Sequence, residues 1–461
     1  MKIAFCSSEV FPFAKTGGLG DVAGALPQAL AKAGCEVKIF MPLYKSIKPE
    51  KTYGGFGTSA LNGIEVVFVK NDDYFLRDSL YTTAEGKDYP DSLERFSFYS
   101  KQVLEILKKI GFKPDIIHNN DWQASTISIY LKTLYQDDSF FKNTKCILTI
   151  HNLAYQGLFE KSRFDALGIS KDYFDMHYLE FWGKVNLLKG GIIFSDKITT
   201  VSPAYAKQVQ TPEYGCGLEG VLQEKKESLY GILNAIDYNI WDPKIDKAIY
   251  KQYDPLTIEN KAINKAGLQE ELGLKKDKNV LLLGMVTRLA EQKGIDIFSK
   301  ALDEMLKKYQ LVVLGQGEPK YHKILQEKQA KFRDSFSLQL SFNEVLAHKI
   351  YAASDIFLMP SRFEPCGLSQ MISYKYATIP LVHYTGGLID TVKDVSQGGG
   401  GFVFNNYKSE DLISAIERAD SLFQNKDKWR ELIKKVTNYN FSWETAAKEY
   451  IKLYEKLINY K

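Results

Sequence analysis

The sequence has few of the residues that build covalent or metal-bound frameworks. Its five cysteines form an odd, scattered set among 461 residues, with no Cys-x-x-Cys pair. That pattern argues against a disulfide framework and a structural zinc site, and it indicates a reducing, cytoplasmic location. No Asp-x-Asp pair and no cluster of histidine, cysteine and aspartate is present to hold a catalytic metal. We therefore expect neither a metal site nor a cofactor.

A surplus of charge and long apolar runs are also absent. The chain carries 60 basic and 56 acidic side chains, a formal net charge of +4. This balance gives no reason to expect binding to nucleic acid or to an anionic membrane. No apolar run reaches the length that spans a bilayer, and the first apolar residues meet a polar Ser-Ser-Glu stretch too soon for a signal peptide. Any site for an anion must therefore be local.

What the sequence does contain is a regular alternation of short apolar runs with segments of helical periodicity. The first half predicts strands at 2–7, 37–41, 63–70, 95–99, 115–118, 145–151, 197–202 and 230–236, and helices at 20–33, 100–109 and 122–134. The second half predicts strands at 279–286, 310–315, 337–342, 355–360 and 379–384, and helices at 294–308, 344–353 and 367–376.

This order of elements is typical of α/β proteins with doubly wound parallel sheets. More than ten strands are too many for one ordinary sheet, so the sequence predicts two such domains. We place them at 1–240 and 241–440, followed by an amphipathic terminal helix within 441–461. Ligands of doubly wound sheets bind beyond the carboxyl ends of the strands, so the loops at those ends are the place to look for chemistry.

The glycine-rich segment at 13–24, FAKTGGLGDVAG, has three interpretations. The spacing of Gly18, Gly20 and Ala23 matches a loose dinucleotide fingerprint, but a long segment separates it from the preceding strand and no acidic residue closes the second strand. A phosphate-binding loop would use Lys15, the glycine amides and the N-terminus of the following helix. A plain glycine turn that packs strand against helix is the third interpretation.

Two loops after strands of the second half carry charge. Arg288 and Lys293 share one loop, with Gly294 at the start of the next helix. Two cations at a helix N-terminus suit a diphosphate, although a solvated charged loop is the simpler alternative. Glu364 lies in a stiff loop between a phenylalanine and a proline, where a carboxylate can accept hydrogen bonds from paired sugar hydroxyls.

A second Thr-Gly-Gly-Leu sequence, at 385–388, repeats the one in the opening loop. We expect Thr385 to cap the helix that follows and the amides of Gly386 and Gly387 to face a phosphate. Two such loops, one in each half, are hard to explain as accidental turns.

Polar side chains also end two strands of the first half. Asp121 follows the strand predicted at 115–118, and His151 and Asn152 end or follow the strand predicted at 145–151. A lone histidine at a strand end is more often structural than catalytic. We nevertheless expect these residues in the same cleft as the other loops, because the carboxyl ends of parallel strands share one edge of a sheet.

Seven segments together resemble one known family. They are KTGGLGDV, HNNDWQA, TIHN, GILNAID, TRLAEQKG, SRFEPCGLSQ and TGGLIDTV, and they extend over nearly the whole chain. The combination resembles bacterial glycogen synthases and plant starch synthases, which form glycosyltransferase family 5 and have the GT-B fold. The resemblance implies two Rossmann-like domains facing across a cleft, with a C-terminal helix that crosses back to the first domain.

The resemblance also implies an activity, the retaining transfer of glucose from ADP-glucose to the non-reducing end of an α-1,4-glucan such as glycogen. It gives catalytic roles to His151, Arg288, Lys293 and Glu364. In the family, an aromatic residue at the place of Phe342 stacks on adenine. The resemblance gives donor-binding roles to Lys15, Gly17, Gly18, Asp21, Asp121, Asn152, Asn234, Phe342, Cys366, Gly367, Leu368, Thr385, Gly386 and Gly387.

The mechanism that the resemblance implies needs no second carboxylate. The motifs contain no carboxylate pair like that of retaining glycosidases, and the family reaction is a front-face substitution in which the leaving diphosphate takes the acceptor's proton. Lys15, Arg288 and Lys293 would stabilise the charge that grows on the diphosphate. The chain departs from the family at Ala235, where a glycine is usual, and at Ile372, where the wider clan often has a second glutamate.

Three alternative functions remain open. A related transferase could use a UDP- or GDP-linked sugar. A nucleotide-dependent oxidoreductase is disfavoured by the missing ribose acid, and a non-catalytic glucan-binding protein would have no need of diphosphate ligands. Nucleotide release from a panel of nucleotide sugars distinguishes these functions. The sequence gives no indication of the oligomeric state.

Overall fold

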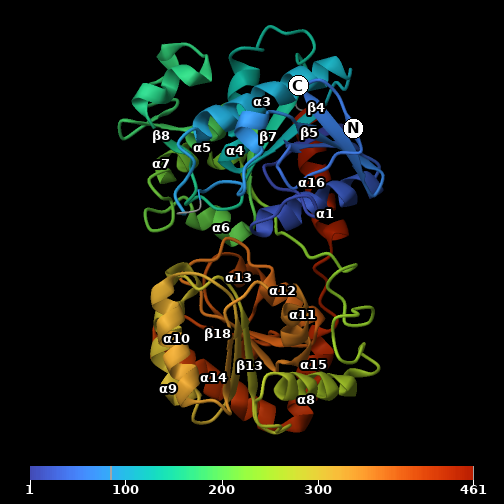
Figure 1. Ribbon diagram of the computed structural model, residues 1–461, viewed down its shortest axis with the longest axis vertical. Helices are drawn as coiled ribbons and strands as arrows, with labels where there is room; N and C mark the ends of the chain where they lie inside the picture. Colours follow the sequence, from blue (N-terminus) through green and yellow to red (C-terminus); the bar gives the residue numbers. More distant parts are fainter. Residues whose placement is uncertain (84–85, 460–461) are drawn as a thin grey trace. The chain divides into compact units, whose positions relative to one another are not determined.

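The computed structural model describes residues 1–83 and 86–459 (Figure 1). The chain divides into two compact units. Unit 1 contains Met1–Asn234 and Trp443–Lys461, and unit 2 contains Ala235–Ser442. The boundaries predicted at 240 and 440 lie close to these divisions, and the C-terminal segment belongs to unit 1.

The core of unit 1 is a nine-stranded sheet in the order β12-β11-β7-β6-β1-β2-β5-β4-β3. Neighbouring strands are parallel from β12 to β5, and β4 and β3 complete the sheet as antiparallel strands. The strands are β1 (Lys2–Cys6), β2 (Glu36–Pro42), β3 (Lys51–Thr52), β4 (Phe56–Leu61), β5 (Ile64–Val69), β6 (Ile116–Asn120), β7 (Lys145–Ile150), β11 (Lys197–Thr200) and β12 (Leu229–Gly231). Their apolar runs are almost fully buried, as expected for a parallel sheet covered on both faces.

The strand order of unit 1 reverses beside β1. The chain runs from β1 outward to β2 and β5, then returns to β6 on the other side of β1. Ile3 of β1 accordingly pairs with Val37 on one side and with Ile116 on the other. The loops after β1 and β6 therefore leave the sheet at a topological switch point, where doubly wound folds bind their ligands.

Unit 1 also contains eight α-helices and a small second sheet among its described residues. The helices are α1 (Gly18–Lys32), α2 (Asp72–Phe75), α3 (Ser92–Lys109), α4 (Asp121–Lys132), α5 (Leu187–Phe194), α6 (Pro203–Gln208), α7 (Glu219–Glu224) and α16 (Trp443–Ile458). The small antiparallel sheet, which the sequence pattern did not predict, contains β8 (Leu158–Glu160), β9 (Glu180–Phe181) and β10 (Lys184–Asn186).

The strand predicted at 95–99 was wrong, because these residues lie inside α3. The aromatic alternation in RFSFY imitates the two-residue period of a strand. Over the longer window, however, the buried residues Leu93, Phe96, Val103 and Leu107 follow the helical period of three to four residues. The longer pattern therefore decides the structure.

The terminal helix α16 packs beside α1 within unit 1 (Figure 1). Its Tyr454 hydroxyl lies 2.6 Å from Nδ1 of His118, a buried residue of β6, and the other imidazole nitrogen lies 2.6 Å from the Thr149 hydroxyl. Burial lowers the pKa of His118 to about 3, so the imidazole is neutral. The helix is thus tied to the centre of the sheet.

The core of unit 2 is a six-stranded, fully parallel sheet in the order β15-β14-β13-β16-β17-β18. The strands are β13 (Leu282–Val286), β14 (Gln310–Leu314), β15 (Phe336–Gln339), β16 (Ile356–Met359), β17 (Ile379–His383) and β18 (Phe402–Phe404). Counted along the chain this is the order 3-2-1-4-5-6, which identifies a doubly wound sheet whose switch point lies between β13 and β16.

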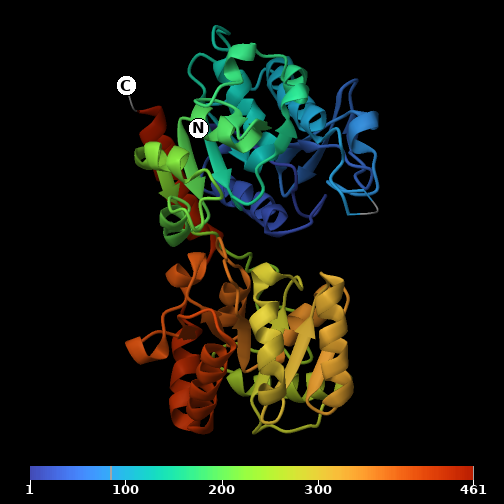
Figure 2. The same ribbon diagram turned by 90° about the vertical axis from the view of Figure 1, so that its left-hand side faces the viewer.

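Helices pack on both faces of this sheet (Figures 1 and 2). One group, α9, α10 and α14, packs together, and α8, α11 and α12 form the other. The helices of unit 2 are α8 (Lys261–Glu271), α9 (Ile295–Met305), α10 (Pro319–Lys331), α11 (Glu344–Ala353), α12 (Ser369–Lys375), α13 (Gly386–Thr391), α14 (Ser409–Gln424) and α15 (Lys426–Val436).

Candidate active site

A largely buried charged pair of predicted site residues lies at the switch point of unit 2. Lys293, in the loop after β13, places its Nζ 2.6 Å from Oε2 of Glu364, in the loop after β16. Glu364 is only 6% exposed, and the Ser361 hydroxyl also donates to it, at 3.1 Å. A cavity of about 20 Å³ opens beside the pair. It is lined by Met285, Val286, Thr287, Lys293, Leu358, Met359, Pro360, Ser361, Glu364 and Ser369.

Gly294 brings the two loops together. Its φ is +76°, in the left-handed region, and a Cβ at this position would lie 1.9 Å from the carbonyl oxygen of Pro360. Only a glycine lets the backbone of the first loop approach the second so closely. The contact between Lys293 and Glu364 therefore depends on a residue that carries no chemistry itself.

Arg288 has a different environment from Lys293. It is exposed, and its Nη2 donates to the side-chain oxygen of Gln292 at 2.9 Å. Lys293 is held by a carboxylate, whereas the Arg288 guanidinium donates to a neutral amide. The loop thus offers an anion one accessible guanidinium and one ammonium that it would share with Glu364.

The Thr-Gly-Gly-Leu loop after β17 differs from expectation in two ways. The Thr385 side chain does not cap α13; it is fully buried, and its hydroxyl has no hydrogen-bond partner among the described residues. The Gly387 amide is not free for a phosphate, because it donates to the backbone oxygen of Glu364 at 3.0 Å. A Cβ on Gly387 would lie 2.4 Å from Cα of Cys366, so the loops after β16 and β17 are packed directly against each other.

The remaining predicted residues of unit 2 lie on these loops or near them. Gly367 has φ +74°, and Leu368 directly precedes α12. Phe342 lies in the loop between β15 and α11, and it is 86% exposed. The next residue, Asn343, caps α11 by accepting from the Leu346 amide at 2.9 Å. Phe342 therefore presents a free aromatic face held next to a fixed helix end.

In unit 1, Lys15 pairs with Asp21, and the N–O distance is 2.6 Å. Both side chains are about one-third exposed, and the Lys15 ammonium also lies 5.6 Å from the ring centre of Phe11. Gly17 and Gly18 stand at the start of α1. The expectation of free glycine amides was wrong for Gly17, because its amide donates to Glu9 at 3.3 Å.

Glu9 is a site residue that the sequence did not single out. It is 3% exposed and accepts from the Thr16 amide at 2.5 Å, the Thr16 hydroxyl at 2.6 Å and the Tyr81 hydroxyl at 2.7 Å, besides the Gly17 amide. A signal was available, since Glu9 lies three positions after the end of β1, in a loop at a strand end. What the sequence could not show was which donors surround it.

Asp121 and His151 lie at the ends of neighbouring strands, β6 and β7. The Asp121 carboxylate accepts from the His151 amide at 2.7 Å and also from the Asn152 amide, and burial raises its pKa to about 7. Nε2 of His151 donates to Oδ1 of Asn120 at 2.9 Å. Burial lowers the pKa of His151 to about 3, so this imidazole is neutral with Nδ1 unprotonated.

Asn234, the last residue of unit 1's first segment, is 6% exposed, and its side-chain oxygen has no partner among the described residues. The structure thus places the predicted residues of unit 1 after the ends of β1, β6 and β7, except Asn234, which follows β12. It groups those of unit 2 around the ends of β13, β16 and β17, with Phe342 beyond β15.

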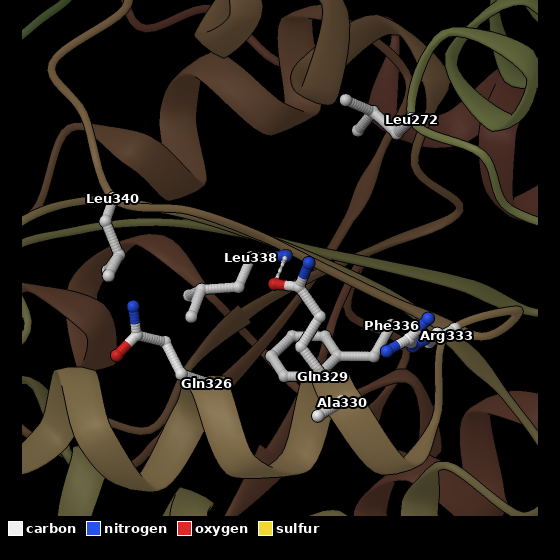
Figure 3. A pocket seen from close by; sticks show the side chains of 8 residues that line it. All are labelled: Leu272, Gln326, Gln329, Ala330, Arg333, Phe336, Leu338 and Leu340. Carbon is white, nitrogen blue, oxygen red and sulfur yellow. Dashed lines mark hydrogen bonds between the residues drawn. The ribbon is translucent and has the colours of Figure 1, made fainter.

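A larger cavity, of about 650 Å³, lies elsewhere in unit 2, between α10 and the edge strand β15 (Figure 3). Its only charged side chain is that of Arg333, and the Gln329 side chain accepts from the Leu338 amide of the strand at 3.1 Å. None of the predicted site residues lines it. The lining residues are Leu272, Gln326, Gln329, Ala330, Arg333, Phe336, Leu338 and Leu340.

Comparisons with known proteins point to one family. A family described as starch synthase catalytic domain matches residues 2–224, and one described as glycosyl transferases group 1 matches residues 265–438. A glycogen synthase of Geotalea uraniireducens is 44% identical over 476 residues, which cover 98% of each chain. The chain belongs to the glycogen synthase family. A glycogen synthase of Thermotoga maritima is also 44% identical, over 489 residues and 99% of each chain.

Solved structures give the same result. The catalytic domain of starch synthase IV from Arabidopsis thaliana, bound to ADP and acarbose, matches with a TM-score of 0.91 and 33% identity over 99% of each chain. Sucrose-phosphate synthase from Thermosynechococcus elongatus matches with a TM-score of 0.65 at 17% identity over both full chains, which shows the fold alone. The glycogen synthase family and the two-domain GT-B fold predicted from the sequence are confirmed.

The described part of this glycogen synthase family member contains neither a membrane-spanning helix nor a metal-binding group of side chains. No helix among the described residues combines the length and the apolar character that crossing a bilayer requires. Within the same residues, no three or more histidine, cysteine, aspartate or glutamate side chains are grouped so as to hold a metal ion. The roles of the individual site residues stay predictions.

Proposed function

We propose that this protein is a cytoplasmic hexosyltransferase that moves glucose from ADP-glucose to the non-reducing end of an α-1,4-glucan such as glycogen, with retention at the anomeric carbon. The single observation that carries the proposal is the Lys293–Glu364 pair with Arg288 beside it, at the switch point of a doubly wound sheet. Family membership supports the reaction class, and the ADP bound to the starch synthase IV relative supports the donor.

In the proposed reaction, unit 2 holds the donor. Arg288 and Lys293 bind the diphosphate, and the N-terminus of α9 directly after them adds a favourable dipole. Glu364 accepts hydrogen bonds from glucose hydroxyls, and the unpartnered Thr385 hydroxyl gains a partner in the bound donor. The exposed ring of Phe342 stacks on the adenine.

The proposed transfer itself needs charge stabilisation more than acid–base catalysis. The bond between the anomeric carbon and the diphosphate breaks, and the leaving phosphate oxygen takes the proton of the acceptor hydroxyl that attacks from the same face. Lys15, Arg288 and Lys293 stabilise the negative charge on the diphosphate. The neutral His151, with Asp121 and Asn234, contacts the sugar through hydrogen bonds without adding a competing positive charge.

The proposal is tested with the purified full chain, glycogen and a panel of ADP-, UDP- and GDP-glucose. Nucleotide release and glucan lengthening are measured together, and the new linkage is assigned by NMR. We expect ADP-glucose to give the highest kcat/KM and an α-1,4 linkage. Equal kcat/KM with UDP-glucose would favour the related transferase, and nucleotide release without lengthening of glycogen would contradict the assigned acceptor.

A further inference from the structure

The Glu9 carboxylate gathers four neutral donors from two separate segments. Thr16 and Gly17 come from the loop that carries Lys15, and Tyr81 comes from a segment more than 60 residues further along the chain. Its Oε1 accepts from both hydroxyls and its Oε2 from both amides, so both carboxylate oxygens are fully used. Glu9 is therefore a fixed anchor for whatever these segments carry.

The donors are as constrained as the acceptor. The Tyr81 hydroxyl also lies 2.8 Å from the Ser8 hydroxyl, and burial, reinforced by Glu9, raises the pKa of Tyr81 well above its ordinary value. The phenol thus remains a donor at any ordinary pH. Gly20 brings the other end of the loop close, since a Cβ there would lie 3.0 Å from the side chain of Lys15. Lys15 therefore lies between the residues anchored by Glu9 and the closely packed Gly20.

We propose that Glu9 is a positioning residue for the transfer reaction, which holds the loop of Lys15 at the end of β1 so that the ammonium can meet the donor diphosphate. This inference rests on the proposed function. Glu9 itself touches neither sugar nor phosphate, and it acts through Lys15. A carboxylate suits this position because it accepts hydrogen bonds from two amides and two hydroxyls at once. No neutral side chain of this size can do so.

The test is a double-mutant cycle of Glu9→Gln and Lys15→Gln, with turnover measured on glycogen and ADP-glucose. Glutamine has about the same size as glutamate, but its amide NH₂ group would face groups that are themselves hydrogen-bond donors. We expect Glu9→Gln alone to lower kcat/KM for the donor about a hundredfold, the value of one well-placed electrostatic group. The KM for glycogen should change less than about twofold, because the acceptor is bound by other residues.

The decisive measurement is the second arm of the cycle. In the Lys15→Gln background, Glu9→Gln should lower kcat/KM by no more than about threefold, because the residue through which Glu9 acts has already gone. A full hundredfold loss in that background would overturn the inference and indicate a general structural role. Unchanged kcat/KM in the single variant would overturn it as well.

Two further variants keep the test decisive. If Glu9→Gln does not fold, Thr16→Val removes one donor and leaves the amide, and we expect an about tenfold loss that again disappears in the Lys15→Gln background. Glu94→Gln alters another carboxylate of unit 1, paired with Arg163 at 2.5 Å, and should leave kcat/KM unchanged. A wild-type protein without turnover would instead contradict the proposed function, so the two failures are distinguishable.

Discussion

Lys293 and Glu364 hold their charged groups 2.6 Å apart although they lie 71 positions apart in the chain. The Glu364 side chain is almost buried, whereas that of Lys293 is about a quarter exposed. In the proposed reaction a diphosphate from solvent has easier access to the ammonium than to the carboxylate. If the two residues act as proposed, they should have separable effects on donor binding and on turnover.

Glu364→Gln should separate these effects. Turnover should fall by close to a thousandfold, about 4 kcal/mol, because an anion beside the developing glucosyl cation is lost in a site of low dielectric. ADP should bind as well as before or more tightly, since Lys293 no longer shares its charge. Steady-state kinetics and calorimetric titration with ADP check both parts, and Glu270→Gln, in an exposed pair with Lys276, is the control. A loss of about tenfold only would mean that Glu364 merely orients hydroxyls.

Lys15→Gln should lower kcat by about a hundredfold or more, since one well-placed electrostatic group contributes roughly 2.7–4 kcal/mol to the transition state. The KM for the donor should change less than kcat. The matched control is Lys45→Gln, which breaks an exposed pair with Asp78 in the same unit and should leave the kinetics unchanged. Near-wild-type turnover in folded Lys15→Gln would show that the opening glycine segment is only a turn.

Gly294→Ala should damage stability and activity together. The new Cβ would collide with the Pro360 carbonyl, and the residue would also be held at positive φ. Gly273→Ala is a matched control, because Gly273 has φ +68° but open space around it. Gly273→Ala should lower the free energy of unfolding by about 1–2 kcal/mol and leave turnover normal. Gly294→Ala should lower the free energy of unfolding by more than that and also cause a large loss of kcat. Equal effects would mean that the contact of the two loops is not needed.

Acid should weaken unit 1 through its buried histidines. The pKa of His118 is about 3 in the folded protein against 6.5 in an unfolded chain, so below pH 6.5 the unfolded state takes up a proton that the folded state refuses. The contribution of neutral His118 to the free energy of unfolding is complete above pH 6.5. It should fall by about 2 kcal/mol between pH 7 and pH 5. Urea unfolding at both pH values should show a smaller loss for His118→Gln than for wild type. His177→Gln, at an exposed position, should behave like wild type, and equal losses in all three proteins would contradict the assignment.

The elements that form the site could be predicted from the sequence because local periodicity is enough to place the ends of buried strands. Arg288, Glu364 and Asp121 all follow such ends, and parallel pairing then brings them to one edge of their sheet. The local pattern failed where two periods competed, as in the aromatic alternation at 95–99, which lies within α3, and it missed the short strands of the small antiparallel sheet.

The hydrogen-bond partners could not be predicted, because each depends on a residue distant in the sequence. The Gly387 amide was expected to be free, yet the Glu364 carbonyl oxygen accepts it. Thr385 has the residue type of a helix cap, but its hydroxyl makes no hydrogen bond to the amides of α13. Glu9 accepts a hydrogen bond from Tyr81, a residue so distant in the sequence that no local pattern indicates the contact. These contacts are set by how loops pack after the sheets have formed.

The place of α16 in unit 1 has a consequence for how the protein is made. Unit 1 is discontinuous in sequence, because all of unit 2 is encoded before its last helix. On the ribosome, β6 and α1 emerge long before Tyr454, so His118 has no contact with Tyr454 until α16 has been made. Unit 2 is contiguous and can fold before α16 has been made, whereas unit 1 is completed only when α16 joins it.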